Sequence, residues 1–333
     1  MHAYYSAATS RPATEDGMEV SSAGGAFVIA VAIAGTVGNA LTIAALLLRM
    51  RREHSGNASS VFIVSLSAAD LCFCSLNLPF AASSLLQGAW THGPLLCRLV
   101  AAGRYLNVGV SLLSITAIAV NRYVLVVRPS LYGRLYGRAG IWWMVAATWL
   151  APCFLLAPTL AGVWGRFGPD PRSPGCSVVA SGGRSPKAFL FVAAFLVPCL
   201  AIVYCYAAIF RHARKARLQL EAHGEAARRR QDEWRITRMV LVIFLSFLAC
   251  YLPITIVKVV DAEVRHPAAH LGSQLLLYLS ACINPIIYGV TNRQYRRAYA
   301  QLLGSVAALC CSQASYATEQ TDGKQRDSQQ TSL

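Results

Sequence analysis

Long apolar segments, separated by shorter polar ones, occupy most of the chain. Five contain no Asp, Glu, Lys or Arg, and each is close to the roughly 20 residues that an α-helix needs to cross a bilayer. Two more each contain one charged residue, Asp70 or Arg104, which a helix bundle tolerates when the side chain faces inward. The pattern predicts an all-α membrane protein with seven spans, at 26–48, 61–86, 99–120, 141–163, 188–210, 239–257 and 271–290.

The remaining segments complete the predicted organisation. Residues 1–25 are polar and lack the apolar core of a signal peptide, so we expect an extracellular N-terminal segment followed by a first helix that acts as its own insertion signal. Residues 26–290 form the seven-transmembrane-helix bundle. In 291–304, Tyr and Leu recur at helical spacing among arginines, which predicts a short amphipathic cytoplasmic helix on the membrane surface. The polar tail, 305–333, is expected to be disordered.

Two connecting loops are long. Residues 164–187 are rich in Gly, Pro and Ser, and we expect an irregular loop there. Residues 211–234 are instead rich in Ala, Arg, Glu and Gln, which predicts that the fifth and sixth helices continue beyond the membrane.

Basic residues are concentrated on one side of the predicted spans. The chain has a formal net charge of +15, and most of its 30 Lys and Arg lie in the first, third and fifth loops and after the last helix. The positive-inside rule therefore places these segments in the cytoplasm and the N-terminus outside the plasma membrane. We interpret the charge as a topology signal and a match to anionic membrane lipid, and we expect no nucleic-acid partner.

Two of the 11 cysteines fall on the oxidising side of the predicted membrane. These are Cys97, at the outer end of the third helix, and Cys176, in the second outer loop, and we expect a disulfide between them. Cys310 and Cys311 follow the last helix among cytoplasmic residues. Palmitoylation of this pair is one interpretation, and unmodified thiols are the alternative.

Ordered motifs along the spans resemble those of the rhodopsin-like (class A) G-protein-coupled receptors. The resemblance extends over nearly the whole chain and implies a receptor that signals through heterotrimeric G proteins, not an enzyme. The motifs are Gly38-Asn39, Leu66–Asp70, Trp90 with Cys97, Asn121-Arg122-Tyr123, Trp149 with Pro158, Pro198 with Tyr206, Cys250–Pro253, and Asn284–Tyr288.

The resemblance implies a polar site in the middle of the membrane. Asp70, Ser111 and Asn284 would face one another there, and in related receptors such a site often binds sodium. A buried carboxylate needs compensation by charge or hydrogen bonds, so a hydrated polar cluster without an ion is the alternative. No other cofactor is expected.

The resemblance also implies a cytoplasmic latch. Arg122 would contact the G protein once the sixth helix moves outward, and Glu233 would hold Arg122 in the closed state. Most relatives have Asp before this Arg, whereas Asn121 is neutral and cannot form that ion pair. The departure predicts raised basal activity, unless Glu233 alone sets the latch. The family places three tyrosines in the same coupling region: Tyr123, Tyr206 and Tyr288.

Arg104 stands where receptors for biogenic amines carry Asp, which argues against an amine ligand. A buried Arg in a membrane protein is usually paired, so Arg104 would bind an anionic or lipid-like ligand, or would instead pair with Asp261 or Glu263. Tyr251 replaces the Trp that most relatives have at the floor of the ligand pocket. The further candidate contacts are Tyr105, Val108, Lys258 and Tyr278.

Within the family, the chain looks most like the invertebrate Moody and Trapped-in-endoderm receptors, and melatonin receptors come next. This resemblance implies a role in cell migration or in epithelial and barrier organisation. A melatonin-like receptor is the alternative, although Pro285 differs from the Ala usual in melatonin receptors.

The sequence also predicts further partners and bears on other functional classes. Thr331-Ser332-Leu333 fits the carboxyl terminus that PDZ domains bind, and phosphorylated Ser and Thr in the tail would recruit arrestin. Residues 271–290 lack the Lys that a retinal protein requires, and the absence of internal repeats disfavours a seven-helix transporter. Metal-binding and catalytic motifs were not found in the accessible regions.

Overall fold

The computed structural model describes most of the chain, including every predicted span. The described residues are 15–53, 58–170, 174–181, 183, 185–217, 225–261, 263–293, 295–302 and 304. Within them, only the backbone is described for 15–20, 53, 215–217 and 225–233.

Seven helical segments in this part of the chain are long and apolar enough to cross a membrane, which confirms the predicted fold class. Most are single helices, but the second and fifth spans each contain a short π-helix. In chain order the spans are α2 (Glu15–Glu53); α3 (Ala58–Cys72) with η1 (Phe73–Asn77) and α4 (Leu78–Leu86); α5 (Gly93–Val127); α7 (Arg138–Leu160); α8 (Lys187–Phe191) with η2 (Val192–Leu196) and α9 (Val197–Arg217); α10 (Glu225–Val260); and α11 (Pro267–Thr291).

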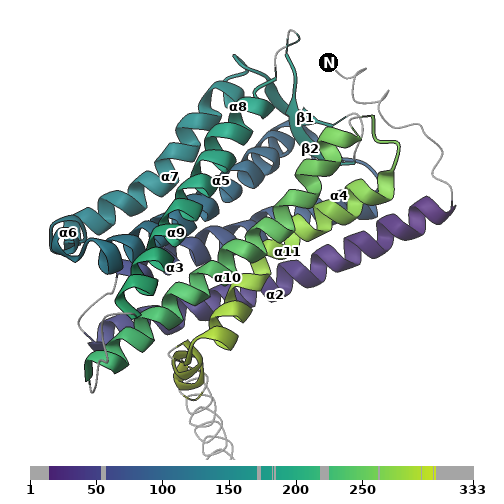
Figure 1. Cartoon of the computed structure of the whole chain (residues 1–333). Helices are drawn as coiled ribbons and strands as arrows, with labels where there is room; N and C mark the ends of the chain where they lie inside the picture. The colour runs from purple at the N-terminus through teal and green to yellow at the C-terminus, as the bar shows by residue number, and fades with distance from the viewer. Residues whose placement is uncertain are drawn as a thin grey trace, which may run out of the picture.

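The spans pack side by side as one bundle (Figure 1), and α5 has the central position, in contact with α3, α7, α9 and α10. Its inward-facing residues, including Leu112, Ile115 and Ile118, are fully buried. The short helix α6 (Pro129–Leu135) follows α5 at one end of the bundle, and a β-hairpin lies at the opposite end. These are called the Arg122 end and the hairpin end below.

The start of α2 and the end of α7 differ from the predicted span limits. Helix α2 begins at Glu15 instead of residue 26. Helix α7 ends at Leu160 instead of 163 because Gly162 adopts a left-handed backbone with φ of 76°, a conformation that glycine accepts and that terminates helices. The amides of Gly162 and Val163 then bond to the carbonyls of Thr159 and Pro158.

The prediction of an irregular loop at 164–187 was wrong. Strands β1 (Arg166–Pro169) and β2 (Cys176–Val179) pair antiparallel, with Phe167 opposite Val178. Both of these side chains are buried, in a small apolar cluster with Leu156 and Leu190. Burial against neighbouring helices stabilises a two-stranded hairpin that would be marginal alone.

Both π-helices end two residues before a proline. Helix η1 precedes Leu78-Pro79, and η2 precedes Val197-Pro198. Proline has no backbone N–H, and its ring collides with the carbonyl four residues earlier in a regular α-helix. One wider turn moves that carbonyl aside, so the helix continues past the proline without breaking.

The predicted amphipathic helix after α11 is present at 295–302. Tyr295 and Ala298 face the bundle and are buried, whereas Arg296 and Arg297 are exposed. The Tyr295 ring stacks on Tyr288 with 5.5 Å between centroids. Burial raises the pKa of Tyr295 to about 12, so this side chain is a neutral packing group at physiological pH.

Candidate functional site

The predicted mid-membrane cluster is assembled around Asp70. Asn284 on α11 donates its amide to Asp70 Oδ2 at 2.7 Å, and Ser111 on α5 donates its hydroxyl to Asp70 Oδ1 at 3.2 Å. Asn107, which was not predicted, donates to the same Oδ1 at 3.2 Å. It lies one turn before Ser111, so the i, i+4 spacing could have identified it.

A small cavity adjoins this cluster. Its lining adds the hydroxyls of Ser246 and Ser280 to Asp70, Ser111 and Asn284, with Phe247 and Ile283 closing it. The free space of about 10 Å³ is close to the lower limit for one water molecule. A single carboxylate with several neutral oxygens suits a monovalent hard cation or a water molecule. No group of three or more His, Cys, Asp or Glu able to hold a metal occurs in the described part of the chain.

At the hairpin end, Arg104 on α5 contacts the β-hairpin. Its Nη2 donates to the backbone carbonyl of Cys176 at 2.6 Å, and Tyr278 on α11 lies within electrostatic range of the guanidinium. The guanidinium lies 5.8 Å from the ring centroid of Tyr105, whose hydroxyl is 3.4 Å from Ser177 Oγ. The hairpin, α5 and α11 therefore meet at this cation.

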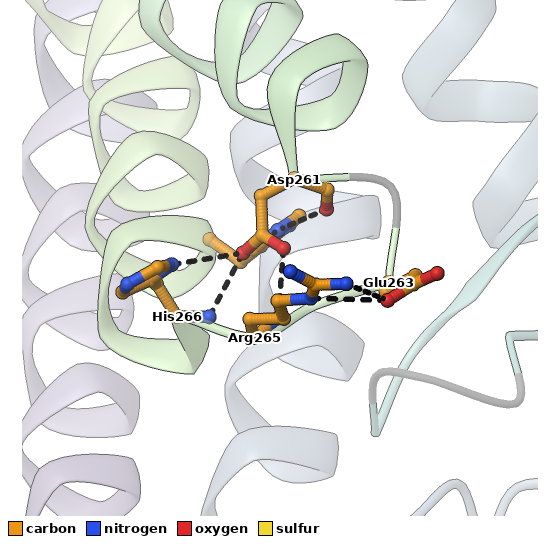
Figure 2. A network of polar contacts seen from close by, with 5 residues as sticks. Asp261, Glu263, Arg265 and His266 are labelled. Carbon is orange, nitrogen blue, oxygen red and sulfur yellow. Dashed lines mark hydrogen bonds and ion pairs between the residues drawn. The ribbon is translucent and has the colours of Figure 1, made fainter.

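The alternative in which Arg104 pairs with Asp261 or Glu263 is wrong, because both acids have other partners (Figure 2). Asp261 accepts the backbone amides of Arg265 and His266, each at 2.8 Å, and Glu263 pairs with Arg265 at 2.7 Å. The two amides hold the pKa of the Asp261 carboxyl below its ordinary value. Asp261 thereby fixes the turn that begins α11.

Two imidazoles also approach Asp261 Oδ2. His270 Nε2 lies 3.3 Å away and His266 Nδ1 3.6 Å away. His270 Nε2 is also 3.0 Å from the carbonyl oxygen of Asp261. The end of α10 is thus tied to the first turn of α11 at the hairpin end.

The other predicted ligand contacts surround Arg104. Lys258 on α10 lies within electrostatic range of Tyr105, Arg104 and Asp170. Tyr278 accepts the amide of Gln274 at 2.6 Å. Farther toward the centre of the bundle, Val108 packs on the main core and Tyr251 stacks on Phe247 with 4.0 Å between centroids. Lys258 thus supplies a second basic group near Arg104, whereas Val108 and Tyr251 belong to the apolar core of the bundle.

At the Arg122 end, a serine joins the two predicted latch residues. Ser59 on α3 donates to Asn121 Oδ1 at 2.9 Å and accepts Arg122 Nε at 3.2 Å and Nη2 at 2.5 Å. Asn121 also donates to the Tyr132 hydroxyl at 3.4 Å. Neither Ser59 nor Tyr132 was predicted, because both lie outside the predicted spans and the sequence does not show which of such residues reach α5. The Glu233 side chain lies outside the described residues.

The three coupling-region tyrosines have different surroundings. Tyr123 packs against Tyr204 with 5.9 Å between ring centroids. Tyr206 donates its hydroxyl to the Thr237 carbonyl at 3.0 Å and so links α9 to α10. Tyr288 is fully buried. Of these, Tyr206 is attached to α10, the helix that moves outward in the latch hypothesis.

The predicted disulfide between Cys97 and Cys176 is confirmed. It joins the first turns of α5 to β2, on the strand whose carbonyl Arg104 contacts. The remaining predicted sites, Cys310, Cys311 and 331–333, lie outside the described residues.

Comparisons with known proteins agree with this geometry. A family profile described as 7 transmembrane receptor (rhodopsin family) matches residues 38–288. The structure of squid rhodopsin superposes with a TM-score of 0.76 at 23% sequence identity, over 88% of each chain. At that identity the structural match supports the fold alone.

Similar sequences come from insects and vertebrates. G-protein coupled receptor moody of Drosophila melanogaster is 42% identical over 81% of this chain and 49% of its own length. Protein trapped in endoderm-1 of the same species is 36% identical, over 80% and 73%. Melatonin receptor type 1B-B of Danio rerio is 29% identical, over 84% and 81%.

The chain spans about half the length of the moody receptors that it matches. The expected resemblances are nevertheless confirmed, because the family profile extends from within α2 to within α11 and the two insect receptors are 42% and 36% identical. With seven spans, the polar cluster on Asp70 and the buried Arg122 in place, the chain belongs to the rhodopsin family of seven-transmembrane receptors.

Proposed function

We propose that this multi-pass membrane protein is a receptor that transmits an extracellular signal to heterotrimeric G proteins. The observation that carries the proposal is that one helix, α5, holds both Arg104 at the hairpin end and Arg122 at the opposite end. Displacement of α5 or of its neighbours by a ligand would therefore act on the buried Arg122 directly. A G-protein-dissociation panel on cells expressing the chain tests this, and no change with any G protein would contradict it.

The hairpin end is the extracellular end in this proposal, and α2 begins outside the plasma membrane. The disulfide at the hairpin end and the basic residues gathered toward the opposite end support that orientation. An epitope tag placed before Glu15 should be stained on intact cells. Staining only after permeabilisation would contradict the orientation.

The ligand in this proposal carries an anionic group and is not an amine. Arg104 and Lys258 supply positive charge at the hairpin end, and Tyr105 and Tyr278 supply hydroxyls beside them. Val108 and Tyr251 offer the apolar surface that a lipid-like tail requires. A screen of acidic lipids and carboxylates, with melatonin included for the alternative reading, would identify the class.

Arg104→Ala should abolish the response to any anionic agonist from that screen without loss of surface expression. Arg98→Ala is the matched control, because Arg98 lies on the same helix and is exposed. Full potency at Arg104→Ala would exclude the anionic-ligand proposal.

Asp70, Ser111 and Asn284 would hold a sodium ion, with Ser246 and Ser280 close enough to the cavity to join. The ion would compensate the buried carboxylate and favour the closely packed arrangement of the spans. Replacing sodium by a large organic cation should then raise basal signalling in the wild type but not in Asp70→Asn. Equal responses of the two proteins would favour a hydrated cluster.

The cellular role proposed from the similarity to moody and trapped in endoderm-1 is in cell migration or in epithelial and barrier organisation. Arrestin, a PDZ-domain protein at 331–333 and palmitoylation at Cys310 and Cys311 complete the proposed partners and modifications. Truncation after residue 304 should remove all three without preventing G-protein activation.

A further inference from the structure

Ser59 lies where α3, α5 and α6 meet at the Arg122 end. It is the second residue of α3, and only 2% of its surface is exposed. Asn121 and Arg122, its partners on α5, are both 0% exposed. A polar side chain so deeply buried stabilises the structure only if its hydrogen bonds are made.

Ser59 acts both as a donor and as an acceptor, as a hydroxyl group can. Its hydrogen goes to Asn121 Oδ1 at 2.9 Å. Its oxygen accepts Arg122 Nε at 3.2 Å and Nη2 at 2.5 Å. Because the hydroxyl hydrogen points to Asn121, the oxygen has its lone pairs free to face the guanidinium. The hydrogen bonds therefore run in one direction, from Arg122 to Ser59 and from Ser59 to Asn121.

Asn121 extends this chain to the short helix after α5. Its amide nitrogen donates to the Tyr132 hydroxyl on α6 at 3.4 Å, and Tyr132 stacks on Tyr136 with 4.9 Å between centroids. The orientation of the Asn121 amide is therefore set from both sides, with oxygen toward Ser59 and nitrogen toward Tyr132. This orientation is the one that lets Ser59 accept from Arg122.

We propose that Ser59 is a positioning residue that holds Arg122 in its buried place and so sets the resting activity of the receptor. The proposal rests on the proposed function, in which Arg122 contacts the G protein. A guanidinium with no exposed surface cannot touch a partner, so Arg122 must become exposed before coupling, and its hydrogen bonds to Ser59 oppose any outward movement of the side chain. A neutral hydroxyl restrains a guanidinium less strongly than a carboxylate does, and Asn121 provides no carboxylate.

Ser59→Ala removes the hydroxyl and keeps a small helix-forming residue. In cells at matched surface expression, agonist-independent G-protein dissociation should rise at least about threefold, since a hydrogen bond to a charged group is lost. Ser59→Thr keeps the hydroxyl and should restore the wild-type level. Unchanged basal activity in Ser59→Ala would overturn the proposal.

The decisive comparison repeats Ser59→Ala in the Asn121→Asp background. A carboxylate at position 121 can hold Arg122 directly, so the rise caused by Ser59→Ala should shrink to less than half of its wild-type-background value. A residue with only a packing role would cause the same change in both backgrounds, and that result would overturn the proposal.

Thermal unfolding separates this inference from the proposed function. The purified proteins are the wild type, Ser59→Ala, Asn121→Asp and the double variant. Ser59→Ala should lower Tm in the wild-type background more than in the Asn121→Asp background, whether or not a G protein responds. A panel silent for every variant would contradict the proposed function alone, whereas equal Tm losses would overturn the role of Ser59. Ser75→Ala is the control, because its exposed hydroxyl bonds only within its own helix, to Leu71.

Discussion

Arg104 and Cys176 are joined by a hydrogen bond of 2.6 Å from the guanidinium to the backbone carbonyl. The charged side chain of α5 is thereby attached to the same strand that the disulfide attaches to the beginning of α5. The hairpin is held at two points, one covalent and one polar. An anionic ligand that engages Arg104 would compete with the Cys176 carbonyl for the guanidinium.

Arg104→Lys tests whether geometry or charge matters at this point. Lysine keeps the charge but lacks the planar fork, which donates to the Cys176 carbonyl and has further N–H groups to offer a ligand. We expect normal surface expression with agonist potency lowered at least about tenfold, by concentration–response measurement with an agonist from the acidic-lipid screen. Wild-type potency would show that charge alone suffices.

Asn121→Asp should lower basal G-protein dissociation. The new carboxylate would lie beside Ser59 and Arg122 and would add an ion pair to the existing hydrogen bonds. Dissociation is compared with the wild type at matched surface expression, with Asn121→Ala as the reference for loss of the amide. Equal or higher basal activity in Asn121→Asp would contradict the prediction.

Gly35→Ala should destabilise the bundle. A Cβ at Gly35 on α2 would lie 2.3 Å from Cys74 Sγ and 3.2 Å from Cys282 Cβ, and such overpacking costs about 1–3 kcal/mol. Tm in detergent should fall by several degrees. Gly272→Ala serves as the control, because a Cβ there meets nothing within 4 Å.

Asp261→Asn should weaken the junction of α10 and α11 in a pH-dependent manner. The amides of Arg265 and His266 lower the pKa of the folded carboxyl, so its stabilisation is present above the unfolded value of about 3.9 and is lost as pH falls through the folded value. The mutant should therefore unfold at a lower temperature than the wild type at pH 7. The difference should shrink as the pH falls below the unfolded value, and a constant difference would refute the linkage.

The spans and the disulfide could be predicted because each depends on a property that is local in sequence. Twenty apolar residues define a span wherever its neighbours lie, and the two outer cysteines stood apart by position alone. The motif residues around Asp70 were also found, and the structure brings Asn284 and Ser111 to that carboxylate.

The residues that sequence reasoning missed depend on contacts between elements. Ser59 lies before the predicted span at 61–86, so the sequence does not distinguish it from a loop serine. In the structure it belongs to α3, and the packing of α3 against α5 brings it to Arg122. The hairpin at 166–179 was missed because this segment is rich in Gly and Pro, which are typical of irregular loops. Its pairing depends on burial of Phe167 and Val178 against residues that are distant in sequence.

The π-turns before Pro79 and Pro198 also change how the two spans should be compared with those of relatives. Each turn inserts one extra residue, and one residue corresponds to roughly 100° of rotation about a helix axis. In a homologue with a regular helix at the same point, side chains with matching sequence positions would face different neighbours from there onward. Beyond such a π-turn, pocket residues of a relative should be matched to this chain by spatial superposition. A match by sequence alignment alone would pair lipid-facing positions with inward-facing ones.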